Sequence, residues 1–281
     1  MVTIGKQFEV NGNKMTIYIE GEGEQTIVFL AGGGTSSPIL DFKSLYSLLS
    51  DDYRIAVVEK VGYGFSDVAD VDRSLPRILE DTRTALQLAD VQKPYILSPH
   101  SMSGIEALYW VQTYPDEVSA IIGLDMAVPA TYNDYDAPMA MLYLGKVAAD
   151  LGVIRWLPGA AESVAIQNGT LTEEEKDLYR TIFYQRTATQ PMINEVKSIK
   201  TNAKIVAGNG EVDHPMLLFT SNGEGTGWDQ KEWVSFQETF ASENSKRRLV
   251  PLNVSHYVHD LVYDEIALEI NQFIKKLELD H

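Results

Sequence analysis

The sequence contains no cysteine, which excludes disulfide bonds, thiolate catalysis and cysteine-ligated metal sites. It also has no run approaching the roughly 20 apolar residues that a membrane-spanning helix needs. The first residues lack the apolar core of a signal peptide, so we expect a cytoplasmic protein. No internal repeat or low-complexity segment is present, which is typical of a compact globular chain.

Basic residues are scarce relative to acidic ones. The 281 residues include 23 Lys and Arg against 40 Asp and Glu, for a net charge of −17. Nucleic acids and anionic membranes are bound through basic surfaces, so we expect neither as a partner. The hydrophobic fraction of 44% and the charged fraction of 22% are ordinary for one large globular domain, or for a domain with an insertion.

Strand-like and helix-like patterns alternate along most of the chain, which favours an α/β fold with a mostly parallel sheet. The alternating stretch 7–20 contains Asn11-Gly12-Asn13, a hairpin signal. Apolar runs predict further strands at 26–30, 54–58, 95–98, 118–124, 216–219 and 248–252. Apolar residues on one face predict helices at 39–50, 75–86 and 261–276, and a helical pattern follows Ser101 over 105–111.

Residues 129–210 break this rhythm, because they contain no clear buried strand and are rich in Met, Leu and Tyr at helical spacing. Thr172 followed by Glu175 is a capping-box signature that opens one of these helices. We therefore expect a core formed by residues 1–128 and 211–281, with a helical cap at 129–210.

The most informative motif surrounds Ser101. An apolar run ends at Pro99-His100-Ser101, and a helical pattern follows. This strand–Ser–helix order is that of a nucleophile elbow, in which a sharp turn lifts a serine above the edge of a sheet. The alternative interpretation is a serine that caps the following helix. A nucleophilic serine needs a histidine base and an acid elsewhere in the chain.

Four segments together resemble the α/β-hydrolase superfamily over nearly the whole length: 30–34 (Leu-Ala-Gly-Gly-Gly), 59–67, the Ser101 elbow and 255–257 (Ser-His-Tyr). The resemblance implies about eight mostly parallel strands between helices, a serine hydrolase with a helical cap, and no cofactor. It also implies that Glu59, Gly62 and Gly64 have structural rather than catalytic roles. The chain departs from the family's Gly-x-Ser-x-Gly elbow, since Pro99 and Ser103 stand at the glycine positions.

The base suggested by the resemblance is His256, which lies between the last predicted strand and the last predicted helix. His259 is its rival, three residues later. His100, beside the serine, matches an elbow residue that is usually structural in the family. The His, Asp and Glu residues show no metal-ligand spacing such as His-x-x-x-His with a nearby acid, so no metal is expected.

Two residues compete for the acid. Most relatives carry the acid after the strand equivalent to 216–219, where only Glu224 is available. Asp125 ends the strand 118–124, and its surroundings resemble the acid-bearing segment of pancreatic-type lipases. A buried acid orients the imidazole better than a Glu among glycines, so Asp125 is preferred and Glu224 remains the alternative.

An oxyanion hole requires two backbone N–H groups, which we assign to Met102 and Gly33. The sequence thus predicts a carboxylesterase-like serine hydrolase acting on a partly apolar small-molecule acyl compound. A slow receptor or regulator with this fold, an aminopeptidase, a lactonase and a perhydrolase are the alternatives. By the resemblance, dehalogenases and epoxide hydrolases would carry Asp at the position of Ser101.

Overall fold

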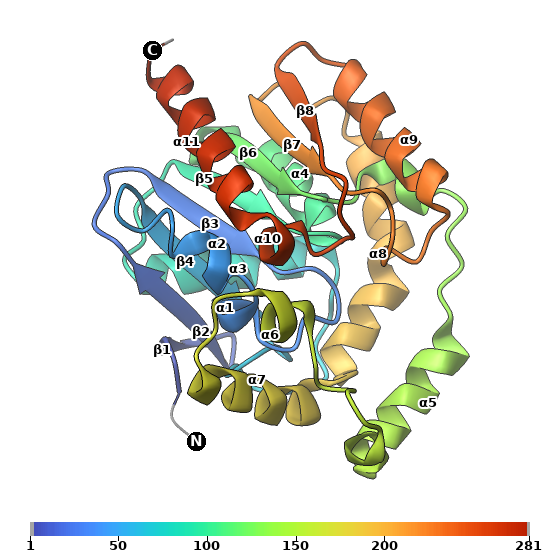
Figure 1. Ribbon diagram of the computed structural model, residues 1–281. Coiled ribbons are helices and arrows are strands. Elements are labelled where there is room, and N and C mark those ends of the chain that lie inside the picture. Colours follow the sequence, from blue (N-terminus) through green and yellow to red (C-terminus); the bar gives the residue numbers. More distant parts are fainter. Residues whose placement is uncertain (1–2, 280–281) are drawn as a thin grey trace.

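The computed structural model describes residues 3–279 and contains one eight-stranded sheet between layers of helices (Figure 1). The strand order is β1-β2-β4-β3-β5-β6-β7-β8. Only the pairs β1–β2 and β2–β4 are antiparallel, which confirms the predicted mostly parallel sheet. The strands are β1 Lys6–Val10, β2 Asn13–Glu20, β3 Thr26–Leu30, β4 Arg54–Glu59, β5 Tyr95–Pro99, β6 Val118–Leu124, β7 Met216–Thr220 and β8 Arg247–Pro251.

Helices cover both faces of the sheet, which explains why β3, β5 and β7 are buried along their whole length. One face carries α3 Leu75–Leu88, α4 Ser103–Thr113, α8 Gln190–Gly208 and α9 Gln230–Ser242. The other carries α1 Pro38–Asp41, α2 Lys43–Tyr46, α6 Val164–Asn168, α7 Glu173–Arg186, α10 Val258–Leu261 and α11 Tyr263–Leu279. Each face has its own apolar core, with Trp110 and Trp233 in the first and Phe29 and Phe42 in the second.

The chain between β6 and β7 is helical. It consists of η2 Pro129–Tyr132, α5 Met139–Asp150, η3 Val153–Trp156 and then α6, α7 and α8. Figure 1 shows α5 standing apart from the sheet, with α6 and α7 beside α1. The predicted capping box is confirmed, because Thr172 Oγ1 accepts from the Glu175 N–H at 3.3 Å and the Glu175 carboxylate accepts from the Thr172 N–H at 2.9 Å.

The helix predicted at 39–50 is wrong in its length. Two one-turn helices, α1 and α2, meet at Phe42, and turns follow from residue 47. The Phe42 ring is fully buried and lies 5.1 Å from the Phe29 ring and 4.7 Å from the His259 ring, centre to centre. The interruption at Phe42 coincides with the packing of its ring against β3, and backbone bonds from Phe42 N–H to Pro38 O and from Tyr46 N–H to Phe42 O continue the helical direction across it.

Parallel strands present their carboxyl ends at the same edge of a sheet, where open α/β sheets place their sites. The glycine loop follows β3, Ser101 follows β5 and Asp125 follows β6, while His256 lies shortly after β8. Four segments that are remote in sequence therefore converge at one edge. In the described part of the chain, no helix has the length and apolar character needed to cross a bilayer.

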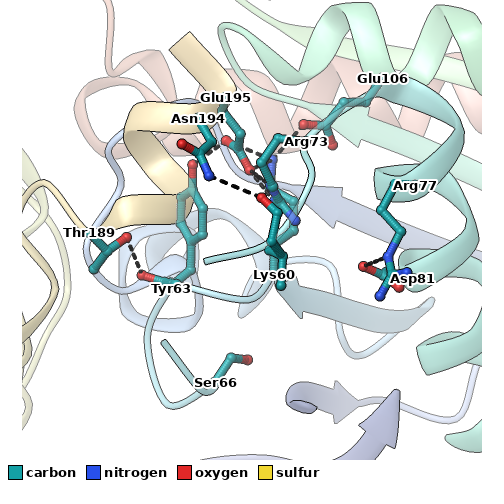
Figure 2. A network of polar contacts seen from close by, with 12 residues as sticks. Lys60, Tyr63, Ser66, Arg73, Arg77, Asp81, Glu106, Thr189, Asn194 and Glu195 are labelled. Carbon is teal, nitrogen blue, oxygen red and sulfur yellow. Dashed lines mark hydrogen bonds and ion pairs between the residues drawn. The ribbon is translucent and has the colours of Figure 1, made fainter. Parts of the chain in front are cut away.

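A buried ionic network ties α8 to the core (Figure 2). The Lys60 ammonium bonds to Glu106 at 2.5 Å and to Glu195 at 3.4 Å. Arg73 donates from Nε to Glu195 at 2.9 Å, and the Tyr63 hydroxyl also bonds to Glu195. Two positive and two negative side chains thus balance one another away from water, and their geometry fixes α8 against α4 and the β4 loop.

Glu59 closes the turn after β4. Its buried carboxylate accepts from the Phe65 N–H at 2.7 Å and the Ile39 N–H at 3.4 Å. A Cβ on Gly64 would lie 2.0 Å from the Glu59 carboxyl carbon, so a side chain there would displace the carboxylate. Burial raises the pKa of Glu59 to about 7, although the two backbone donors and Arg186 act in the opposite direction.

This raised pKa predicts a pH dependence of stability. As pH rises from about 4.5 to about 7, the unfolded chain loses its Glu59 proton before the folded chain does. The contribution of Glu59 to the free energy of unfolding should therefore fall by roughly 3 kcal/mol across this window. Urea unfolding should be measured for the wild type and for Glu59→Gln across this pH range. The free energy of unfolding of the variant should rise by this amount relative to that of the wild type as pH increases. Parallel profiles would contradict the prediction.

Candidate active site

Asp125 and His256 are joined directly. His256 Nδ1 lies 2.5 Å from Asp125 Oδ2, and the two residues are 131 positions apart in sequence. Asp125 is fully buried, and His256 is 6% exposed. A carboxylate placed in this way holds the imidazole with Nδ1 protonated, which leaves Nε2 available as a base.

Two further donors hold the Asp125 carboxylate. The Ser221 N–H donates to Asp125 Oδ1 at 2.8 Å, and the Trp233 indole N–H donates to the same oxygen at 2.9 Å. Asp125 itself has a φ of +47°, an uncommon backbone conformation for a residue other than glycine. Its N–H is fixed at 2.9 Å from Phe219 O on the neighbouring strand. These contacts preorganise the carboxylate at the end of β6.

Ser101 occupies the sharp turn between β5 and α4 and has a φ of +53°. Its carbonyl accepts from the Ala127 N–H at 2.8 Å, which ties the turn to the segment after Asp125. A Cβ on Gly32 would lie 2.8 Å from Ser101 Cβ, so the glycine allows the loop after β3 to approach. The strained left-handed conformation is that expected of a nucleophile elbow.

The two departures from the glycine pattern are accommodated by the fold. Pro99 is the last residue of β5 and pairs with Leu30 at the strand end. The buried Ser103 hydroxyl lies 2.6 Å from Leu30 O and 2.9 Å from His100 O, and donates to one of these carbonyls. A serine at 103 therefore satisfies a backbone acceptor at the crowded turn, which a glycine could not do.

The proposed oxyanion donors lie next to each other. A Cβ on Gly33 would lie 2.5 Å from Met102 Cε, which places the glycine loop against the residue after the serine. Within residues 3–279, neither the Gly33 N–H nor the Met102 N–H donates to a protein acceptor. Both therefore remain available to an anionic oxygen, as an oxyanion hole requires.

The side chains of the alternative candidates Glu224 and His259 do not take part in the contact between Asp125 and His256. The Glu224 side chain is exposed, and its link to His256 is through its backbone carbonyl, which accepts the His256 N–H at 2.9 Å. His259 is fully buried and contacts Asp41 at 3.3 Å. His100 is also buried, with Nε2 3.3 Å from His256 O. Burial, reinforced by the neighbouring His256 and His259, holds the pKa of His100 well below its usual range.

Sequence reasoning did not find Trp233 or Ser221 as partners of the acid. Trp233 is the first-turn tryptophan of α9 and follows Asp125 by 108 positions, so spacing carries no signal of the contact. Trp233 is 1% exposed, and a buried indole N–H usually has an acceptor, but the sequence alone does not show that this tryptophan is buried beside Asp125.

A family model described as alpha/beta hydrolase fold matches residues 25–176, just over half of the chain. The chain belongs to the α/β-hydrolase fold family. It is 32% identical to the uncharacterized protein YbdG of Bacillus subtilis (strain 168), over 97% of this chain and 86% of that protein. The family match confirms the α/β-hydrolase resemblance of the sequence.

Solved structures with the same fold catalyse different reactions. A variant of the Vigna radiata epoxide hydrolase superposes with a TM-score of 0.74 at 20% identity, covering 96% of this chain and 98% of that one. The enol-lactonase from Burkholderia xenovorans LB400 gives 0.71 at 15% identity, covering 96% and 100%. At such identities only the fold is shared, so the chemistry must be argued from the site.

Gly104 offers a test of how the elbow is held. It lies in α4, and a Cβ there would meet Ala127 O at 2.3 Å, whereas one on Gly145 in α5 would meet nothing within 4 Å. Gly104→Ala should lower the free energy of unfolding by about 2–3 kcal/mol through overpacking. Gly145→Ala should raise it by up to about 1 kcal/mol. Equal effects of the two variants in urea unfolding would show that the contact is not tight.

Proposed function

We propose that this protein is a serine hydrolase that cleaves a carboxylic ester or a related acyl compound. The observation that carries the proposal is the 2.5 Å contact between His256 Nδ1 and the buried Asp125 carboxylate, at the sheet edge where Ser101 forms a strained turn. In this proposal Ser101 is the nucleophile, His256 the base and Asp125 the acid, with Gly33 and Met102 as oxyanion donors. The mechanism requires no cofactor.

The reaction follows from these roles. His256 Nε2 removes the Ser101 proton as the hydroxyl oxygen attacks the acyl carbon. The Gly33 and Met102 N–H groups stabilise the negative charge that develops on the carbonyl oxygen. His256 then passes the proton to the leaving alcohol, and the acyl-enzyme remains. A water, deprotonated by the same imidazole, releases the acid and restores the Ser101 hydroxyl.

Asp125 stabilises the imidazolium formed in both steps. Its three N–H donors hold the carboxylate oxygens in place beside the imidazole, so that the negative group lies where positive charge develops on His256. The residue at the elbow is serine rather than aspartate, which supports acyl transfer over the alkyl-enzyme chemistry expected of dehalogenases and epoxide hydrolases.

We further propose that residues 129–210 are a cap that shapes the acyl site. The Tyr179 hydroxyl of α7 donates to Asp41 Oδ1 at 3.0 Å, near the glycine loop. Arg186 at the end of α7 donates to Gly64 O at 2.6 Å, and Thr189 donates to Gly62 O at 3.2 Å. These bonds support a cap anchored on the loops after β3 and β4, with apolar residues left to contact a partly apolar substrate.

A fluorophosphonate probe tests the nucleophile. The wild type should gain the mass of one adduct, because an activated serine attacks phosphorus in the same way as an acyl carbon. Ser101→Ala should gain none, and His256→Ala should react at least about 100-fold more slowly. Intact-mass spectrometry follows the reaction. A folded wild type without an adduct would reject the hydrolase and favour a ligand receptor with this fold.

The acid is tested by comparing Asp125→Asn with Glu224→Gln. Asp125→Asn should lower kcat for a short-chain aryl ester by about 10⁴-fold, because the amide disfavours the required imidazole tautomer. Glu224→Gln should change kcat by less than about twofold, because its exposed carboxylate can be replaced with little effect on its surroundings. The reverse ranking would assign the acid to Glu224.

A further inference from the structure

Asp41, His259 and Asp260 form a second buried cluster, which the hydrolase mechanism does not use. Their side chains are 0–1% exposed. His259 Nε2 lies 3.3 Å from Asp41 Oδ2 and 3.9 Å from Asp260 Oδ2. One ligand atom from each residue lies within 4.8 Å of the other two. Three groups able to bind a metal ion therefore meet at one point between α1 and α10.

The protein satisfies Asp41 in this cluster but not Asp260. Asp41 Oδ1 accepts from the Tyr179 hydroxyl at 3.0 Å, but neither oxygen of the fully buried Asp260 carboxylate has a hydrogen-bond partner among the described residues. Buried carboxylates normally have partners, because an unpaired buried charge is very unfavourable. Two carboxyl groups beside one imidazole leave a shortage of positive charge.

We propose that Asp41, His259 and Asp260 bind one divalent transition-metal ion, and that Zn²⁺ fits best. Imidazole nitrogen and carboxylate oxygen are both ligands that Zn²⁺ accepts in proteins, and the imidazole disfavours Mg²⁺ and Ca²⁺. Zinc bonds of about 2.0–2.1 Å in tetrahedral geometry place neighbouring ligand atoms roughly 3.3 Å apart. The separation of 3.3 Å between His259 Nε2 and Asp41 Oδ2 meets this value. The separation of 3.9 Å to Asp260 Oδ2, and that between the two carboxylates, which lies within 4.8 Å, require side-chain rotation when the ion binds.

The ion would act on the structure rather than on substrate. Asp41 belongs to α1, which follows the glycine loop, while His259 and Asp260 begin three residues after His256. The His259 and His100 ring centres are 4.6 Å apart, as are those of His100 and His256. A bound ion would therefore fix α1 relative to α10 and position His256 through ring packing. Sequence spacing could not reveal the site, because Asp41 and His259 are 218 positions apart.

The test is refolding the full chain from guanidinium and EDTA with no metal, or with one equivalent of ZnCl₂, MnCl₂ or CaCl₂. After desalting, elemental analysis should find about one Zn²⁺ per chain, and the Tm should exceed that of the metal-free sample by about 5 °C or more. Ca²⁺ should give neither effect, since the imidazole is a poor calcium ligand. Ser101→Ala should retain the ion, which separates this proposal from the hydrolase.

The near-isosteric variants Asp260→Asn and His259→Gln should lose the ion and the Zn²⁺-dependent rise in Tm, while the exposed control Asp51→Asn keeps both. A wild type that holds no Zn²⁺, or variants that hold as much as the wild type, would overturn the proposal. If Asp260→Asn has a higher Tm than the metal-free wild type, the Asp260 carboxyl is neutralised by a proton rather than by a metal ion, and the proposal is wrong. Should the variants not fold, zinc X-ray absorption of the wild type must show a single imidazole with oxygen ligands, and two or more imidazoles would overturn the proposal.

Discussion

The buried carboxylate of Asp125 is the group on which the arrangement at the sheet edge depends. It accepts N–H groups from His256, Ser221 and Trp233, which come from three different segments. A fully buried carboxylate without these donors would favour its protonated form and could not orient an imidazole. The loop after β7 with Ser221, helix α9 with Trp233 and the loop after β8 with His256 must therefore come together around this carboxylate. Folding and assembly of the site are coupled for this reason.

The backbone at this edge is strained at two places, Ser101 and Asp125, both with positive φ. Each costs of order 1–3 kcal/mol and persists only where the surroundings determine it. The two strained residues support one another, since Ser101 O accepts from the Ala127 N–H just after Asp125. The parallel strands on either side keep both turns fixed in register, which accounts for a site built on strand ends rather than on free loops.

Much of this was readable from sequence because it depends on local pattern. Buried apolar runs located the strands, and the position of Asp125 at a strand end indicated a more buried carboxylate than Glu224 among glycines, as the structure has it. Long-range packing could not be predicted from the sequence. The interruption of the helix at Phe42 and the contact of the Trp233 indole with Asp125 are two examples. The α5 helix was predicted from the spacing of its apolar residues, yet Met141 and Leu144 are 66% and 70% exposed. Spacing shows which side of a helix is apolar, but it does not show what that side packs against.

Two buried charge clusters in the same molecule differ in a way that bears on the metal proposal. Around Lys60 and Arg73, two cations face Glu106 and Glu195, and the network is connected throughout. Around Asp41 and Asp260, the second carboxyl has no donor. The fold thus balances buried charge where it has the residues to do so, and the unbalanced cluster points to positive charge supplied from outside the chain. A divalent ion supplies two positive charges and coordination positions for both carboxylates together, whereas a proton neutralises only one carboxyl.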